Sequence, residues 1–115
     1  MKTSRKSAKP LQSSASPLPR FRLRFHPEAL EEWHALDNSI RAPLKKLLAK
    51  RLEHPHIPGS ALHPPLAGCY KIKLQKAGVR LVYEVIDEEV IVYVLAVDRR
   101  EDGRVYGSAV RRTAD

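Results

Sequence analysis

The fold is decided by the stretch Cys69–Val85, which reads CYKIKLQKAGVRLVYEV. Apolar and polar residues alternate on both sides of a short Lys-Ala-Gly turn, which is the pattern of a β-hairpin with one face on a core. Lys71 and Lys73 then point to the face opposite the apolar residues. Arg80, on the returning strand, can share their face. The pattern therefore predicts a cluster of three hairpin cations, Lys71, Lys73 and Arg80.

The segments before the hairpin predict a strand, two helices and a long loop. RFRLRF, residues 20–25, alternates arginine with apolar residues as a half-buried strand does. Apolar residues recur at helical spacing over 27–36 and again over 40–52. We expect Pro43 to delay the start of the second helix, because proline lacks the N–H that an interior position needs. Residues 53–68 are rich in proline and glycine, which forbids regular structure.

Two further elements follow the hairpin. VIVYVLAV, residues 90–97, is apolar on both faces, as in a central strand. Residues 103–112 predict a short C-terminal helix. We therefore expect an α+β fold: a small single domain in which an N-terminal strand and a two-helix hairpin pack on an antiparallel-rich four-stranded sheet, with a short C-terminal helix.

Length and charge limit the possible organisation. A chain of 115 residues supports one core. Its net charge is +8, but residues 1–24 hold seven cations and no acid, which leaves 14 cations against 13 acids. We expect residues 1–20 to form a disordered basic tail and residues 21–115 to form the domain. The single cysteine, Cys69, and the lack of a long apolar run favour a soluble cytoplasmic protein without membrane contact.

The hairpin cations are the strongest candidates for a functional site. Arg99 or Arg100 leaves the neighbouring central strand close to them, and Tyr106 can fold back onto the same patch. Clustered cations repel one another unless an anion lies between them, so a phosphate-binding surface is one interpretation. A solvated basic sheet face is the other. Tyr106 is either part of the patch or a half-buried anchor for the last helix.

Other chemistry has little support in the sequence. It contains no glycine-rich phosphate loop and no Ser-His-Asp arrangement. His54, His56 and His63 lie among prolines without the spacing usual for zinc. RNA can be cleaved by attack of its own 2'-hydroxyl on the adjacent phosphate, which needs neither a metal nor a protein nucleophile. We therefore expect no metal and no cofactor.

Two long segments resemble one family. Residues 69–112, CYKIKLQKAGVRLVYEVIDEEVIVYVLAVDRREDGRVYGSAVRR, are similar to the C-terminal half of the RelE family, the ribosome-dependent mRNA interferases of bacterial toxin–antitoxin pairs. Residues 21–48, FRLRFHPEALEEWHALDNSIRAPLKKLL, resemble the N-terminal half. The resemblance implies cleavage of mRNA in the ribosomal A site. It implies five catalytic residues: Lys71, Lys73, Arg80, Arg100 and Tyr106.

The resemblance also implies RNA contacts around this group. We expect them from Arg99, His63, Lys76 and Arg104. The chain departs from the family in its proline-rich loop, where His63 stands nearest to the position of a family arginine.

The partners implied are the 70S ribosome with its mRNA and a RelB-like antitoxin, with operator DNA bound only through the toxin–antitoxin complex. Two alternatives remain: a ParE-like gyrase inhibitor, and a catalytically silent, antitoxin-binding co-repressor. A gyrase inhibitor would not need Lys71, Lys73 and Tyr106 together. The sequence does not exclude the co-repressor.

Overall fold

The structure is a computed structural model that describes residues 20–99 and 103–113. The elements along the chain are β1 (Arg22–Phe25), α1 (Pro27–His34), α2 (Asn38–Glu53), η1 (Pro58–Ser60), β2 (Cys69–Leu74), η2 (Gln75–Ala77), β3 (Val79–Ile86), β4 (Ile91–Asp98) and α3 (Arg104–Thr113). Local signals account for several helix ends. Pro27 suits the first turn of α1, where the His26 side chain accepts the Glu28 N–H at 3.1 Å.

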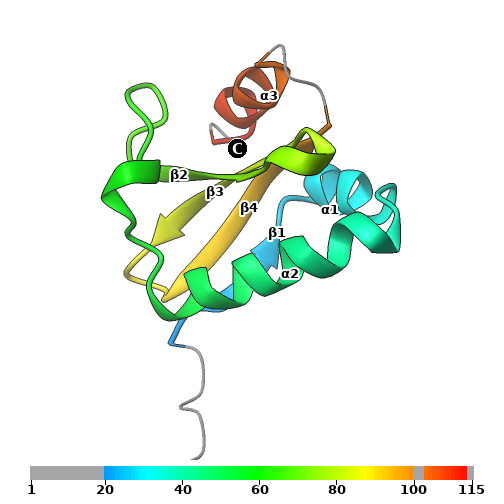
Figure 1. The fold of residues 1–115 in the computed structure, drawn as a ribbon. Coiled ribbons are helices and arrows are strands. Elements are labelled where there is room, and N and C mark those ends of the chain that lie inside the picture. Colours follow the sequence, from blue (N-terminus) through cyan, green and yellow to red (C-terminus); the bar gives the residue numbers. More distant parts are fainter. Residues whose placement is uncertain (1–19, 100–102, 114–115) are drawn as a thin grey trace, which may run out of the picture.

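The four strands form one mixed sheet in the order β1-β4-β3-β2. β3 pairs antiparallel with both β2 and β4, whereas β1 runs parallel to β4. Helix α2 crosses one face of this sheet and α3 lies on the other (Figure 1). The predicted α+β class, with a four-stranded sheet and a short C-terminal helix, is confirmed.

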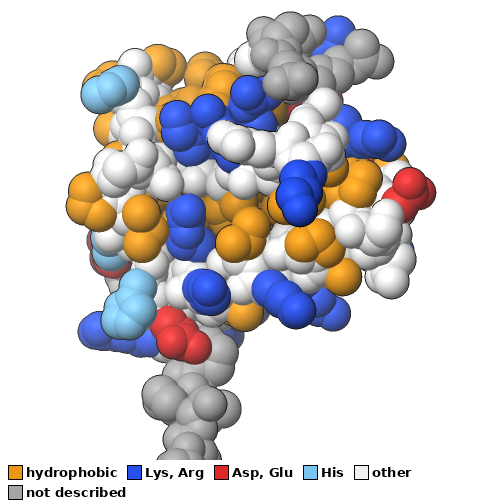
Figure 2. Space-filling view, in the orientation of Figure 1, with side chains coloured by type: hydrophobic (Ala, Val, Ile, Leu, Met, Phe, Trp, Pro, Cys, Tyr) orange, Lys and Arg blue, Asp and Glu red, His pale blue; other side chains and the backbone are white. Residues whose placement is uncertain are grey.

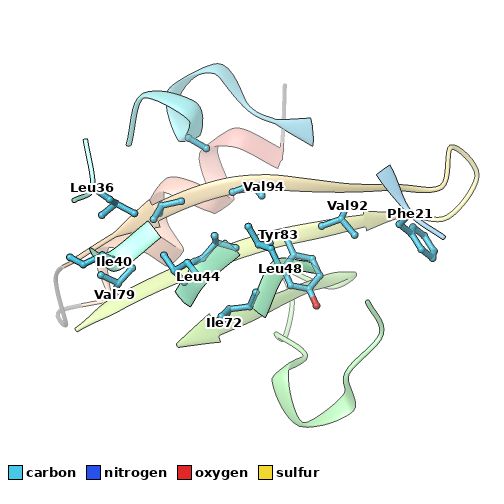
Figure 3. Packing of buried hydrophobic residues seen from close by; sticks show 13 residues of the cluster. Phe21, Leu36, Ile40, Leu44, Leu48, Ile72, Val79, Tyr83, Val92 and Val94 are labelled. Carbon is cyan, nitrogen blue, oxygen red and sulfur yellow. The ribbon is translucent and has the colours of Figure 1, made fainter. Parts of the chain in front are cut away.

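Each face of the sheet has its own core. On the α2 face, Leu44 and Leu48 pack against strand residues that include Ile72 and Tyr83 (Figure 3). On the α3 face, Val105 and Ala109 pack with Val82, Leu95 and Ala96 of the strands. Full burial of one such aliphatic side chain contributes about 1.5–3 kcal/mol, so α3 is held by its apolar face although it is short.

Two local expectations were wrong. Helix α2 begins at Asn38 and keeps Pro43 inside it, so the proline costs one helical hydrogen bond without delaying the start. Val90 does not belong to the central strand, which starts at Ile91. It lies in the preceding turn with a φ of 57°, and its carbonyl accepts the Arg22 N–H at 2.9 Å.

The proline-rich loop is more ordered than its composition predicts. It contains the short helix η1, and Ala61 forms an isolated bridge with Tyr70 along the outer edge of β2. The expected disordered tail, apart from Arg20, lies outside the described residues. None of the helices in the described part of the chain is long and apolar enough to cross a membrane.

Candidate nucleic-acid interface

The strand pairing brings the hairpin cations to one face. Lys73 lies directly opposite Arg80, and Lys71 lies opposite Val82, whose side chain belongs to the core beneath α3. Directly opposed residues in antiparallel strands have Cβ atoms about 4.5–5.5 Å apart and point to the same side. The three cations are therefore close neighbours on the α3 face of the sheet, as the alternation predicts.

Arg80 is the electrostatically unusual member of this group. Its side chain is half-buried, its Nη1 is shielded from solvent, and none of the described residues accepts a hydrogen bond from that nitrogen. A hollow of about 210 Å³ adjoins it, lined by Lys73, Leu74, Gln75, Gly78, Val79 and Arg80. A buried guanidinium N–H without an acceptor is unfavourable, so a movement of the Arg80 side chain that brings this nitrogen to an oxygen of a bound phosphate would be favourable.

Helix α3 carries Tyr106 onto the same face. Tyr106 is half-buried and packs against the cluster that contains Val82, the residue opposite Lys71. Its N–H donates to the Gly103 carbonyl at 3.0 Å, and Gly103 has a φ of 82°, a left-handed conformation that suits glycine. Tyr106 thus packs as an anchor of α3, on the same face of the sheet as the hairpin cations.

The remaining predicted contacts surround this group unevenly. Lys76 is exposed in the turn between β2 and β3, and Arg99 is exposed just after β4. Arg104 is the first residue of α3. His63 is exposed in the loop before β2. Arg100 lies outside the described residues, so its placement stays a prediction.

The anchoring of α3 depends on an ion pair that sequence analysis missed. Arg112 is only 7% exposed and donates to Glu32 of α1 at 2.9 and 3.0 Å, and to the Leu95 carbonyl at 2.8 Å. Glu32 also accepts the Val97 N–H at 3.0 Å. The pair therefore forms hydrogen bonds with the backbone groups at the edge of β4, beyond the point where β1 ends. No local pattern predicts it, because its partners are 80 positions apart.

Burial raises the pKa of two acidic groups on the α3 face, Cys69 and Glu84. Burial, with a smaller contribution from Glu84, raises the pKa of Cys69 to about 12. Burial also raises the pKa of Glu84. A thiol that remains protonated is a poor nucleophile, so Cys69 has the properties of a core residue.

The histidines do not gather. Both ring nitrogens of His56 have partners, the Tyr70 hydroxyl at 3.0 Å and Asp87 at 2.9 Å. Within residues 20–99 and 103–113, no three His, Cys, Asp or Glu side chains are grouped so that they could hold a metal ion.

Comparison with known proteins places this arrangement in a family. A model described as the ParE toxin of type II toxin-antitoxin system, parDE, matches residues 23–103. The mRNA interferase toxin RelE of Escherichia coli (strain K12) is 48% identical over 90 residues, which is 78% of this chain and 94% of that protein. The mRNA interferase RelE of Shigella flexneri matches to the same extent, 48% over 90 residues.

Solved structures agree with the sequence relatives. A free-state variant of E. coli toxin RelE with two arginines changed to alanine superposes with a TM-score of 0.75 at 45% identity, covering 81% of this chain and 97% of the other. The toxin in the intact E. coli RelBE toxin–antitoxin complex gives a TM-score of 0.67 at 46% identity, covering 70% and 98%. This chain therefore belongs to the RelE family of toxins within the RelE/ParE superfamily.

Proposed function

We propose that this protein is the toxin of a type II toxin–antitoxin system and that it inhibits translation by cleaving mRNA in the ribosomal A site. The observation that carries the proposal is the opposition of Lys73 and Arg80, with Arg80 Nη1 lacking an acceptor among the described residues. Tyr106 lies on the same face. A phosphodiester offers the anionic oxygens that such a group of cations binds, and RNA supplies its own nucleophile.

In the proposed reaction the 2'-hydroxyl of one nucleotide attacks the adjacent phosphorus. The O2'–P bond forms and the P–O5' bond breaks, giving a 2',3'-cyclic phosphate and a 5'-hydroxyl. Tyr106 or a neighbouring lysine takes the proton from the 2'-hydroxyl, and Lys73 gives a proton to the leaving 5'-oxygen. Arg80 and Lys71 stabilise the charge that develops on the phosphate oxygens, together with Arg100. No metal and no cofactor take part.

The ribosome supplies substrate positioning. The site offers no histidine pair for acid–base catalysis, so the alignment of the 2'-hydroxyl with the phosphorus has to come largely from the mRNA as the ribosome holds it. Arg99, His63, Lys76 and Arg104 are proposed to contact the RNA around the scissile phosphate. We infer that the protein acts in the cytoplasm, where ribosomes are found.

A second basic surface is suited to ribosomal RNA. Lys45, Lys46 and Lys50 are exposed on α2, on the opposite face of the sheet from the hairpin cations. In Figure 2, which views the molecule with α2 in the lower part as in Figure 1, Lys and Arg side chains are scattered over the visible surface with few acids among them. Lys46 and Lys50 are four residues apart on the helix, where like charges destabilise it unless a polyanion is bound. This surface is proposed to bind the phosphate backbone of the ribosome.

The partner that neutralises the toxin is proposed to be a RelB-like antitoxin. One solved relative is a RelBE toxin–antitoxin complex, and this chain covers nearly all of its toxin. Operator DNA is proposed to bind only through the corresponding complex. Coexpression with the neighbouring gene tests this partner: failure of any antitoxin to copurify, with a free protein that is harmless to cells, would contradict it.

Primer extension on programmed ribosomes tests the activity. Wild type is compared with Arg80→Ala and Tyr106→Phe, with Arg24→Ala as a control on β1, the opposite edge of the sheet. We expect A-site cuts that require the ribosome and fall about a hundredfold in Arg80→Ala, the usual cost of one charge-stabilising donor. Arg24→Ala should cut like wild type. Intact mRNA with wild type, or equal cutting of naked mRNA, would refute the proposal.

A ParE-like gyrase inhibitor is the second candidate, because the matching family model is described as a ParE toxin. Gyrase inhibition through protein contact gives no role to the paired Lys73 and Arg80 or to Tyr106. A supercoiling assay with purified gyrase separates the candidates. We expect no inhibition, and inhibition that persists in Arg80→Ala would favour the ParE-like function.

A further inference from the structure

Arg51 joins three segments of the chain behind the proposed RNA site. It lies near the C-terminal end of α2, and its Nη1 donates to the Tyr83 hydroxyl at 2.8 Å and to the Lys71 carbonyl at 3.3 Å. Its Nη2 donates to the Ser60 hydroxyl at 3.3 Å. One planar guanidinium thus connects a helix, the strand that carries Lys71 and the loop before that strand.

The edge of β2 explains why this connection matters. Among the described strands β2 pairs with β3 alone, so apart from the isolated bridge between Ala61 and Tyr70 its outer edge presents backbone groups that no described strand pairs with. Leu62 N–H donates to the Cys69 carbonyl at 3.0 Å, and the next outward carbonyl, that of Lys71, accepts from Arg51. The loop and Arg51 together therefore cover this edge as far as Lys71.

Tyr83 gives Arg51 a rigid support. Its ring is fully buried on the α2 face (Figure 3). It stacks on Tyr70, with the ring centroids 5.6 Å apart. Its hydroxyl accepts from Arg51 and donates to the Pro55 carbonyl at 2.7 Å. Burial raises the pKa of Tyr83, so this hydroxyl keeps its proton and the donation to Pro55. The Arg51 guanidinium carbon also lies 5.7 Å from the centre of the ring.

We propose that Arg51 is a positioning residue for the RNA site: it fixes the edge of β2 at Lys71, and the loop that carries His63, relative to Arg80. This inference rests on the proposed function. Arg51 itself lies on the α2 face and acts through the Lys71 backbone and Ser60. Lysine cannot replace it, because one ammonium group lacks the planar fork that reaches several acceptors in fixed directions.

The test compares Arg51→Met and Arg51→Lys with a matched control, Arg41→Met. Arg41 lies on the same helix and donates to one backbone carbonyl, that of His34 at 3.1 Å, at the end of α2 away from the loop. Hydrogen exchange of the Leu62 amide reports the loop directly. We expect exchange at least tenfold faster in both Arg51 variants, with β4 amides unchanged, and wild-type exchange in Arg41→Met.

Cleavage kinetics on ribosomes, measured well below the unfolding temperature of each variant, give the second readout. We expect kcat to fall about tenfold or more in Arg51→Met, because misplacing a group that acts in the transition state lowers kcat. Arg51→Lys should recover little of this kcat, and Arg41→Met should keep the kcat of wild type. A variant with a lower unfolding temperature and wild-type kcat has lost only stability, and would overturn the proposal. Unchanged Leu62 exchange would overturn it as well.

The two proposals fail in different ways. A wild type that does not cleave on ribosomes removes the proposed function, and with it the positioning role of Arg51 in cleavage. In that case the hydrogen exchange of the Leu62 amide still tests whether Arg51 holds the loop before β2 in place. A wild type that cleaves, beside an Arg51→Met variant that cleaves equally well, removes only the positioning role.

Discussion

The partly buried ion pair between Arg112 and Glu32 should determine whether α3 stays docked. The change to make is Arg112→Met, which keeps an unbranched apolar stem and removes the hydrogen bonds to Glu32 and the Leu95 carbonyl. Breaking one partner out of a buried pair costs about 3–5 kcal/mol. Glu32 is 31% exposed and keeps its bond from the Val97 N–H, so we expect the lower end, about 3 kcal/mol.

Glu28 provides the internal comparison. It also contacts Arg112, at 3.2 Å, but its side chain is 64% exposed, so Glu28→Gln should cost about 0.5 kcal/mol or less. Glu32→Gln should cost about 2 kcal/mol, because a largely buried cation keeps only part of its pairing. Glu32 also raises the pKa of Arg112, so the guanidinium stays charged at every pH that the fold tolerates.

Urea unfolding followed by circular dichroism measures these free energies of unfolding. The double variant Arg112→Met with Glu32→Gln should cost clearly less than the sum of the single variants, because the second change no longer removes a partner. The reasoning is refuted if Arg112→Met lies within about 1 kcal/mol of wild type. Equal costs for Glu28→Gln and Glu32→Gln would refute the role given to burial.

Three further predictions concern Cys69, Val90 and the lysines of α2. The Cys69 thiol should resist iodoacetamide at pH 8 in the folded protein and react after unfolding, and rapid alkylation of the folded protein would contradict this. Because the pKa of Cys69 is raised from 9.0 to about 12, the free energy of unfolding of wild type should also fall relative to Cys69→Ala as pH rises above 9, by up to about 1.4 kcal/mol per pH unit. Val90→Asn should raise the free energy of unfolding by about 1 kcal/mol, since asparagine tolerates a φ of 57° better than a β-branched residue; a lower unfolding temperature would count against this. Replacing Lys45 and Lys46 by glutamine should weaken ribosome binding and reduce its salt dependence, measured by cosedimentation at several salt concentrations, whereas an unchanged salt slope would exclude this surface.

The hairpin could be predicted from the sequence because its information is local. The period-two alternation assigns each residue to a face, and the short turn fixes the register that sets Lys73 opposite Arg80. The parallel pairing of β1 with β4 could not be predicted in this way. It depends on a contact between strands more than sixty positions apart, and no local pattern encodes the partner.

The environment of charged residues near the site could not be predicted from local sequence either. Lys50 and Arg51 are neighbours on one helix and look alike in the sequence, yet Lys50 is exposed and Arg51 has three hydrogen-bond partners. On α3, Arg111 is exposed and donates to Gly107 and Ser108 of its own helix, whereas Arg112 is buried and reaches Glu32 and Leu95. Hydropathy periodicity predicts where apolar side chains are buried. It does not predict where a guanidinium finds acceptors, because those acceptors come from distant segments.

The distribution of satisfied and unsatisfied arginines supports a functional role for Arg80. Both terminal nitrogens of Arg51 and of Arg112 donate hydrogen bonds within the chain, and each arginine joins segments that the fold has to hold together. Nε of Arg112 is also buried without an acceptor, so the contrast with Arg80 lies in the terminal nitrogens. Arg80 joins nothing comparable: its Nη1 is buried and without an acceptor among the described residues. An unmet buried donor costs about 1–3 kcal/mol, a large part of the stability of a small domain. A substitution of Arg80 that stabilises the free protein while it abolishes RNA cleavage would therefore be the signature of a residue kept for an anion.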